Sequence, residues 1–249
     1  MRDWDAATYD RVSSPQVEWA GPVLDPLELR GDETVLDAGC GSGRVTAMLI
    51  ERVPRGRVIA VDAAPAMVAK AREEIGDRAE VLLLDLAELR LREPVDAVFS
   101  NAVFHWVLDH DRLFRRLFEA MRPGAQLEAQ CGGAGNIQTF HDAVNHLADR
   151  PPFSDYFEDW QGPWYFASDD ETAQRLERIG FTDVKCWLED RPVTPPEPQD
   201  FIRTVCLGHH LEQLPDELRD TLVGHVVETL GNPLTLEYVR LNISARRPA

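Results

Sequence analysis

Cysteine is scarce and scattered in this chain of 249 residues. The four cysteines lie far apart and no two form a C-x-x-C pair, which argues against a disulfide framework and against a zinc site. The N-terminal MRDWDAATYD has no apolar stretch typical of a signal peptide, and no apolar run approaches the length of a membrane span. These absences predict a cytoplasmic protein with no bound metal, whose thiols are buried or incidental.

Basic side chains are also in the minority. The chain has 26 Lys and Arg against 43 Asp and Glu, a formal net charge of −17, and its only basic clusters are short, at 115–116 and 246–247. Such a surface repels both nucleic acid and anionic membranes, because binding to a phosphate backbone depends on clustered Lys and Arg. We therefore expect a small-molecule partner rather than a nucleic acid or a lipid surface.

Short apolar segments alternate with helical ones from residue 33 onward. Strands are expected at 34–39, 57–62, 79–85, 95–101 and 125–133, and helices at 44–53, 65–75 and 109–121. A helix within 169–180 and a strand before 190 resume this rhythm later, and a last strand is expected at 235–247. Alternation of this kind, with near-continuous apolar strands, is typical of a parallel sheet covered by helices on both faces.

The remaining segments interrupt this rhythm. Two amphipathic helices are expected near 198–212 and 215–230, and residues 153–166 hold seven of the chain's twenty aromatic residues. The aromatic block either covers a pocket or fills the core of a helical subdomain, and the two interpretations can both hold. We predict one α/β domain over 1–249: a Rossmann-like, doubly wound, seven-stranded, mostly parallel sheet (about 31–133, 168–190 and 235–249) with a helical and aromatic lid (about 1–30, 134–167 and 191–234).

Three glycines follow the first expected strand, in the sequence ETVLDAGCGSGRVTAML. No lysine follows Gly43, so the loop is not a phosphate loop. A dinucleotide G-x-G-x-x-G motif fails in both registers, because its third glycine would fall on Arg44 or Thr46. Asp37, two residues before Gly39, would repel a pyrophosphate but suits a ligand with an amino or sulfonium group.

Acidic residues also end the next two strands. Asp62 lies about twenty residues beyond the loop, where a carboxylate can accept both hydroxyls of a ribose, and Asp85 would lie beside an adenine. Each carboxylate alone could be a helix cap or a surface acid. Three of them at successive strand ends, on the ligand side of a parallel sheet, indicate a ligand site.

The segments VLDAGCGSG, AVDAAPAM, LLLDLAEL and VFSNAVFHWVLDH occur in this order and resemble the successive motifs of class I S-adenosylmethionine (SAM)-dependent methyltransferases. Within that class, WDAATYD and SNAVFHWVLDH are similar to the trans-aconitate methyltransferase group, whose relatives methylate malonyl-carrier protein and insect juvenile-hormone acid. The resemblance is strong over 33–133, weaker over 1–20 and 168–190, and weakest in the lid.

The resemblance implies a role for individual residues. Asp37, Gly39, Cys40, Gly41 and Gly43 would surround the methionine end of SAM, and Asp62 would hold its ribose. The remaining cofactor contacts would come from Ala63, Met67, Asp85 and Leu86 at the adenine, Asn101 and Ala102 beneath the sulfonium, and Tyr9 closing over the cofactor. Tyr9 could equally be a core tyrosine.

The acceptor is less well defined by the sequence. His105 and Trp106 follow the fourth strand, nearest the transferring methyl, so we expect them in the pocket, with His105 as a base or hydrogen-bond donor unless it packs on the following helix. A tricarboxylate would call for several arginines, but the first lid helix offers only Arg203, with Gly208 in place of a second cation. The aromatic block favours a more apolar acceptor. The expected acceptor contacts are Trp160, Trp164, Tyr165, Arg203 and His209.

The sequence therefore predicts SAM-dependent methyl transfer to a small molecule, at a carboxylate or hydroxyl oxygen. Two alternatives stay open at this point: a nucleotide-dependent oxidoreductase built on the same sheet, and a cofactor-binding protein without catalysis.

Overall fold

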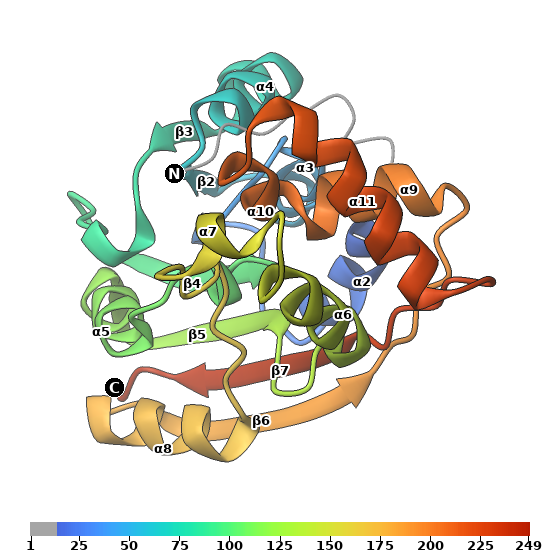
Figure 1. Ribbon diagram of the computed structural model, residues 1–249. Helices are drawn as coiled ribbons and strands as arrows, with labels where there is room; N and C mark the ends of the chain where they lie inside the picture. Colours follow the sequence, from blue (N-terminus) through green and yellow to red (C-terminus); the bar gives the residue numbers. More distant parts are fainter. Residues whose placement is uncertain (1–13) are drawn as a thin grey trace.

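The computed structural model describes residues 14–249 and contains one seven-stranded sheet (Figure 1). Its strand order is β3-β2-β1-β4-β5-β7-β6; β7 pairs antiparallel with both β5 and β6, and the other pairs are parallel. The strands are β1 (Thr34–Ala38), β2 (Arg57–Asp62), β3 (Glu80–Leu83), β4 (Val95–Asn101), β5 (Met121–Gly132), β6 (Thr182–Asp190) and β7 (Val239–Arg246). This is the predicted Rossmann-like, mostly parallel sheet. The strand order reverses between β1 and β4, which is where open parallel sheets bind ligands.

Helices cover both faces of the sheet because its strands are apolar on both sides. On one face lie α2 (Ser14–Leu24), α3 (Arg44–Arg52) and α4 (Pro65–Ile75). On the other lie α5 (His110–Ala120) and α8 (Asp169–Ile179), which contact each other and bury Leu113, Phe114 and Leu176. Pro65 opens α4 and Gly76 ends it, as expected from the preference of proline for the first helical turn.

A second apolar core lies in the region predicted to form the lid. It is built by α6 (Gln138–Ala148), α7 (Ser154–Phe157), α9 (Pro198–Phe201), α10 (Gly208–Glu212) and α11 (Asp216–Leu230), and Figure 1 shows α11 alongside α9 and α6. Phe153 and Phe157 are buried in this core, whereas Trp160 and Trp164 are only partly buried against it. Part of the aromatic block therefore does fill a helical core.

Several boundaries differ from the sequence prediction; β7, for example, begins at Val239 rather than at 235. β5 begins at Met121 rather than at 125, and it accommodates Pro123 and Gly124 in an irregular pairing with β4, where Met121 pairs with Val95 and Gln126 with Ala97. The helix expected over 198–212 is interrupted by a π-helical turn, Ile202–Cys206, so that α9 and α10 are separate short helices. None of the described helices is both long and apolar enough to cross a membrane.

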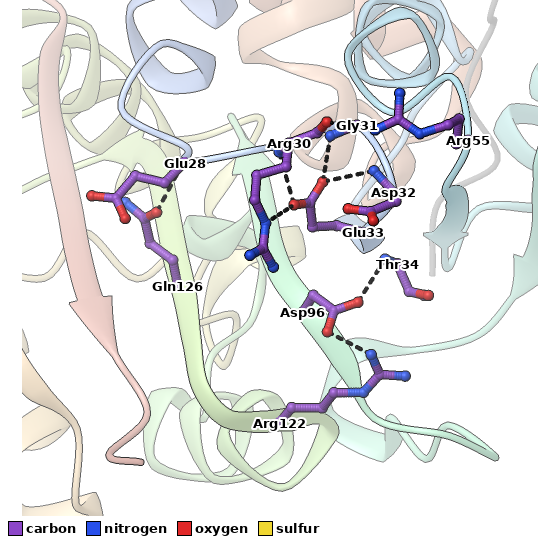
Figure 2. A network of polar contacts seen from close by, with 10 residues as sticks. All are labelled: Glu28, Arg30, Gly31, Asp32, Glu33, Thr34, Arg55, Asp96, Arg122 and Gln126. Atoms are coloured by element: carbon purple, nitrogen blue, oxygen red, sulfur yellow. Dashed lines mark hydrogen bonds and ion pairs between the residues drawn. The ribbon is translucent and has the colours of Figure 1, made fainter.

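A network of polar contacts fixes the amino ends of β1 and β4, at the edge opposite the glycine loop (Figure 2). The Glu33 carboxylate accepts hydrogen bonds from the backbone N–H groups of Arg30 (2.8 Å) and Gly31 (2.9 Å). Asp96 accepts one from the Thr34 N–H (2.8 Å) and is paired with Arg122. Burial raises the pKa of Glu33, but these N–H groups outweigh it and hold the pKa below its usual value. The network fixes the start of β1, and so the position of the loop at its other end.

Candidate cofactor and acceptor site

A cavity of about 660 Å³ opens at the carboxyl ends of β1, β2 and β4, within the size range of small-molecule sites. The predicted cofactor residues that line it are Asp37, Gly39, Cys40, Gly41, Asp62, Ala63, Met67, Asp85, Leu86, Asn101 and Ala102. Tyr9 lies outside the described residues. Gly43 is the exception among the described ones, because it does not line the cavity.

Gly39 and Gly43 of the glycine loop are each required by a different close contact. Gly39 has a φ of +98°, and a Cβ there would lie 2.1 Å from Cγ2 of Val103, so only a bare backbone lets the loop approach the segment after β4. Gly43 has a φ of +91° at the start of α3, and a Cβ there would lie 2.9 Å from Cδ1 of Ile75. Gly43 therefore allows close packing against α4 and does not itself line the cavity.

Asp37 is a buried carboxylate at the base of the loop, 1% exposed. It accepts a hydrogen bond of 2.6 Å from Oγ1 of Thr46. Burial raises the pKa of Asp37 to about 7. The hydrogen bond from Thr46 opposes this rise, and the charge of Asp62 adds a smaller contribution to it. A cation bound in the cavity beside Asp37 would stabilise its ionised form.

Asp62 lies at the end of β2 and faces the loop from the next strand. Its two carboxylate oxygens accept hydrogen bonds from the N–H groups of Gly41 and Ala64, each at 2.9 Å. Burial raises the pKa of Asp62, although these N–H groups oppose the rise. The side chain is thus held in one orientation at the cavity wall with lone pairs left for hydroxyl donors.

Asp85 combines two roles that the sequence left as alternatives. Its carboxylate caps the short helix Leu86–Glu88 by accepting a hydrogen bond of 2.8 Å from the Ala87 N–H, and it also lines the cavity. Met67, on α4, is buried and closes the same part of the wall. This end of the cavity therefore has an apolar surface with a carboxylate at its edge, which suits a base such as adenine.

The opposite end of the cavity lies after β4, where the backbone takes an unusual conformation. Ala102 has a φ of +62°, and its N–H donates to the Gln130 carbonyl at 2.7 Å. Left-handed backbone at a non-glycine residue is strained and is found most often at functional sites. The segment after Ala102 leads into the short helix Phe104–Trp106, which brings the Trp106 ring to the cavity. The centroid of this ring lies 5.2 Å from that of the His209 ring.

His105 does not face this cavity, which corrects its expected position. Its ring is buried behind Trp106, where Nδ1 accepts a hydrogen bond of 3.2 Å from the Gly132 N–H and the side chain lines a separate cavity of about 40 Å³. Burial, reinforced by Arg240, holds the pKa of His105 well below its usual value. The lowered pKa makes the imidazole a weak base, and the ring lies outside the main cavity, so we do not propose His105 as the base.

The predicted acceptor residues separate into two groups. Trp160 and His209 line the main cavity, whereas Trp164 lines the small one and stacks on Phe166. Tyr165 lies elsewhere, with its hydroxyl bonded to Glu171 and Arg175. Arg203 is paired with Asp220 on α11 and lines neither cavity. Tyr165 and Arg203 therefore line neither of the two cavities, and we do not propose them as acceptor contacts.

Several lining residues were not predicted. They are Ser42, Arg44, Val45, Ala64, Ala87, Phe99, Val103, Val107, Leu108, Asp109, Pro163, Glu212 and Gln213. Two of them could have been found from spacing, since Arg44 directly follows Gly43 and Glu212 lies one helical turn after His209. Most of the others adjoin predicted residues at the strand ends, and only Pro163 and Gln213 depend on how the lid packs on the sheet.

The residues present fit a ligand that combines a cationic group, a ribose and an adenine. Asp37 is a buried carboxylate, and within residues 19–249 it forms no ion pair with a basic side chain. Asp62 presents hydrogen-bond acceptors to hydroxyl groups, and Asp85 borders an apolar slot. At Gly41, a Cβ would meet nothing within 4 Å, so the loop borders open space on this side.

Comparison with known proteins agrees with this geometry. A family profile described as "Methyltransferase domain" matches residues 35–124. The trans-aconitate 2-methyltransferase of Methylobacterium nodulans is 33% identical over 62% of this chain, an alignment that spans 59% of that protein. An uncharacterized methyltransferase of Schizosaccharomyces pombe, C70.08c, is 30% identical over 98% of both chains. YcgJ of Bacillus subtilis, a solved structure, has a TM-score of 0.67 at 15% identity, over 93% of this chain and 99% of that one.

The fold and the site define a SAM-dependent enzyme of the Rossmann-like type. The chain belongs to the class I SAM-dependent methyltransferases and is related to the trans-aconitate methyltransferase group. It is a methyltransferase with SAM as its cofactor, and these matches do not favour the oxidoreductase alternative.

Proposed function

We propose that the protein transfers a methyl group from SAM to an oxygen atom of a small, largely apolar molecule. Bound SAM would supply an electrophilic methyl group. The Asp37 carboxylate would hold its ammonium group, Asp62 its ribose hydroxyls, and Asp85 with the Leu86 N–H its adenine edge. These contacts would orient the sulfonium toward Asn101, Ala102 and Trp106, where the acceptor would bind.

The observation that carries the acceptor assignment is the lining of the cavity after β4. Trp106, Trp160 and Leu108 give it apolar walls, and within residues 19–249 Arg44 is the only Lys or Arg that lines the cavity. Several relatives are named trans-aconitate 2-methyltransferases, which supports an oxygen acceptor. A substrate with three carboxylates would need more cations than this lining offers, so we do not propose trans-aconitate itself.

The chain's contribution to the rate would be alignment and exclusion of water. Holding an acceptor in line with the methyl group can supply about 7–11 kcal/mol of the barrier. The rings of Trp106 and Trp160 would fix a flat acceptor and keep water from the sulfonium. The partly exposed Leu108, at the mouth of the cavity, would extend this apolar surface.

A transfer assay with SAM labelled on its methyl group tests this proposal. We expect label in products of carboxylic acids or phenols with one polar group and an apolar body, and little with trans-aconitate. Efficient transfer to trans-aconitate would contradict the acceptor class. Binding of SAM without transfer to any acid or hydroxyl compound would favour the non-catalytic alternative.

A further inference from the structure

The short helix α10 brings two polar side chains of one helical turn into the main cavity. Nδ1 of His209 lies 3.5 Å from Oε2 of Glu212, and both residues line the cavity. A carboxylate at one ring nitrogen orients an imidazole and stabilises its protonated form. The pair is thus arranged like the base and its orienting group in enzymes that activate a hydroxyl.

The chain directs His209 to the cavity through the π-helical turn that precedes α10. In this turn the Leu207 N–H donates to the Ile202 carbonyl at 2.7 Å, five residues earlier, which changes the face that the following turn presents. Turns of this kind occur frequently at functional sites. The neighbouring His210 points the other way and is buried beside Trp160, with ring centroids 4.5 Å apart. Burial lowers the pKa of His210 to about 3, so it does not take part in proton transfer.

The position of His209 matches that of the acceptor. Its ring is 5.2 Å from that of Trp106, which follows the strained Ala102 at the end of β4. Asp109 also lines the cavity, so that two carboxylates, with Glu212, face the region an acceptor would enter. Against the single cation Arg44 among the described lining residues, these carboxylates disfavour an anionic acceptor and tolerate a neutral one.

We infer that His209, oriented by Glu212, is the proton acceptor of the reaction and that the acceptor is a neutral hydroxyl compound, a phenol or an enol, rather than a carboxylate. This inference rests on the proposed function. A carboxylate is ionised near neutral pH and needs no base, whereas a phenol has a pKa of about 10. The acceptor oxygen forms a bond to the methyl carbon, its proton moves to Nε2 of His209, and the electrons of the carbon–sulfur bond return to the sulfur.

The first test measures binding without turnover. Phenols and the benzoic acids of the same skeleton are titrated by calorimetry into protein saturated with S-adenosylhomocysteine. We expect phenols to bind more tightly than their benzoic acid counterparts, and His209→Gln to weaken phenol binding by about 3- to 10-fold through the lost hydrogen bond. His146→Gln, at an exposed position on α6, is the matched control and should change nothing.

The second test measures turnover on the same pairs. We expect His209→Gln to lower kcat with phenols by about 10²- to 10⁴-fold, the usual contribution of a positioned base. Glu212→Gln should lower kcat less, with KM for the phenol unchanged, because it removes only the stabilisation of the imidazolium.

The outcomes separate the two levels of the proposal. If the wild type methylates only the benzoic acids, the proposed function stands and the hydroxyl acceptor is overturned. If His209→Gln leaves phenol binding and turnover within about threefold of the wild type, or slows both classes equally, His209 is not the proton acceptor. If the wild type binds SAM but methylates neither class, the proposed function fails as well.

Discussion

Replacing Asp37 with asparagine should make the ligand-free protein more stable while weakening its binding of SAM. The Asp37 side chain is 1% exposed and is hydrogen-bonded to Thr46, and burial raises its pKa to about 7. An acid whose pKa is higher in the folded than in the unfolded state destabilises the fold progressively as the pH rises from about 4 to above 7. Asparagine keeps the shape and can still accept the Thr46 hydrogen bond, but has no charge to bury.

The size of the effect follows from the pKa. A rise from 3.8 to about 7 corresponds to about 4 kcal/mol at pH 8, using 1.36 kcal/mol per pKa unit. This is an upper bound because Asp37 borders a cavity open to water, so we expect a gain of about 1–3 kcal/mol. For a domain of this length each kcal/mol corresponds to about 2–4 °C in Tm.

Binding should change in the opposite direction. Loss of a hydrogen bond to a charged group costs about 1.5–3 kcal/mol, so the affinity for SAM should fall by about 10- to 100-fold. In the wild type the affinity should also decrease as the pH falls from 8 to 6, because Asp37 becomes protonated, and this decrease should be absent in Asp37→Asn.

Thermal unfolding of the ligand-free protein at pH 5 and pH 8, together with SAM titrations from pH 6 to 8, checks both parts. The exposed Asp77→Asn serves as the control. A lower Tm for Asp37→Asn at pH 8, or SAM affinity equal to that of the wild type at every pH, would show that Asp37 is neither a destabilising buried charge nor the partner of the ammonium group.

Three further changes test other parts of the account. Asp62→Ala should reduce the affinity for SAM at least about 10-fold, which corresponds to the loss of one hydrogen bond to a charged group. Calorimetry measures this affinity, and an unchanged value would refute the ribose assignment. Gly39→Ala should lower stability by about 2–5 kcal/mol in denaturant unfolding, through a left-handed φ and a Cβ only 2.1 Å from Val103. Gly41→Ala also has a left-handed φ, of +53°, but its Cβ meets nothing, so it should cost only about 1–2 kcal/mol. Glu33→Gln should lower Tm at pH 7 by the loss of about 1–3 kcal/mol. Since the pKa of Glu33 is lowered in the fold, its contribution is present above pH 4.5 and is lost as the pH falls through the folded-state value, so a destabilisation that grows toward pH 3 would contradict this role.

The sheet could be predicted from the sequence because local chemistry and tertiary structure agree there. The strands 57–62 and 95–101 have the predicted bounds, since apolar runs end at the acid or amide that lines the cavity. β5 is longer than predicted, because an irregular pairing with β4 absorbs Pro123 and Gly124, residue types that usually interrupt a strand. The π-helical turn before α10 has no local signal, since its residues suit an α-helix equally well.

The candidate site was predicted more completely where it belongs to the sheet than in the lid, where only Trp160 and His209 of the five expected acceptor residues line the main cavity. The acids at strand ends must converge at one edge of a parallel sheet, so Asp37, Asp62 and Asp85 could be placed from the sequence alone. An aromatic or basic residue in the lid has no such constraint. Tyr165 pairs with Glu171 and Arg175 instead of lining the cavity, and only the packing of α8 determines this.

Calorimetry tests most directly the central claim that the loop from Asp37 to Gly43 holds the methionine end of SAM. We expect saturable binding of SAM and of S-adenosylhomocysteine at one site per chain, with SAM affinity reduced by Asp37→Asn, and no binding of NADH. Tight binding of NADH with no heat from either adenosyl compound would contradict the account.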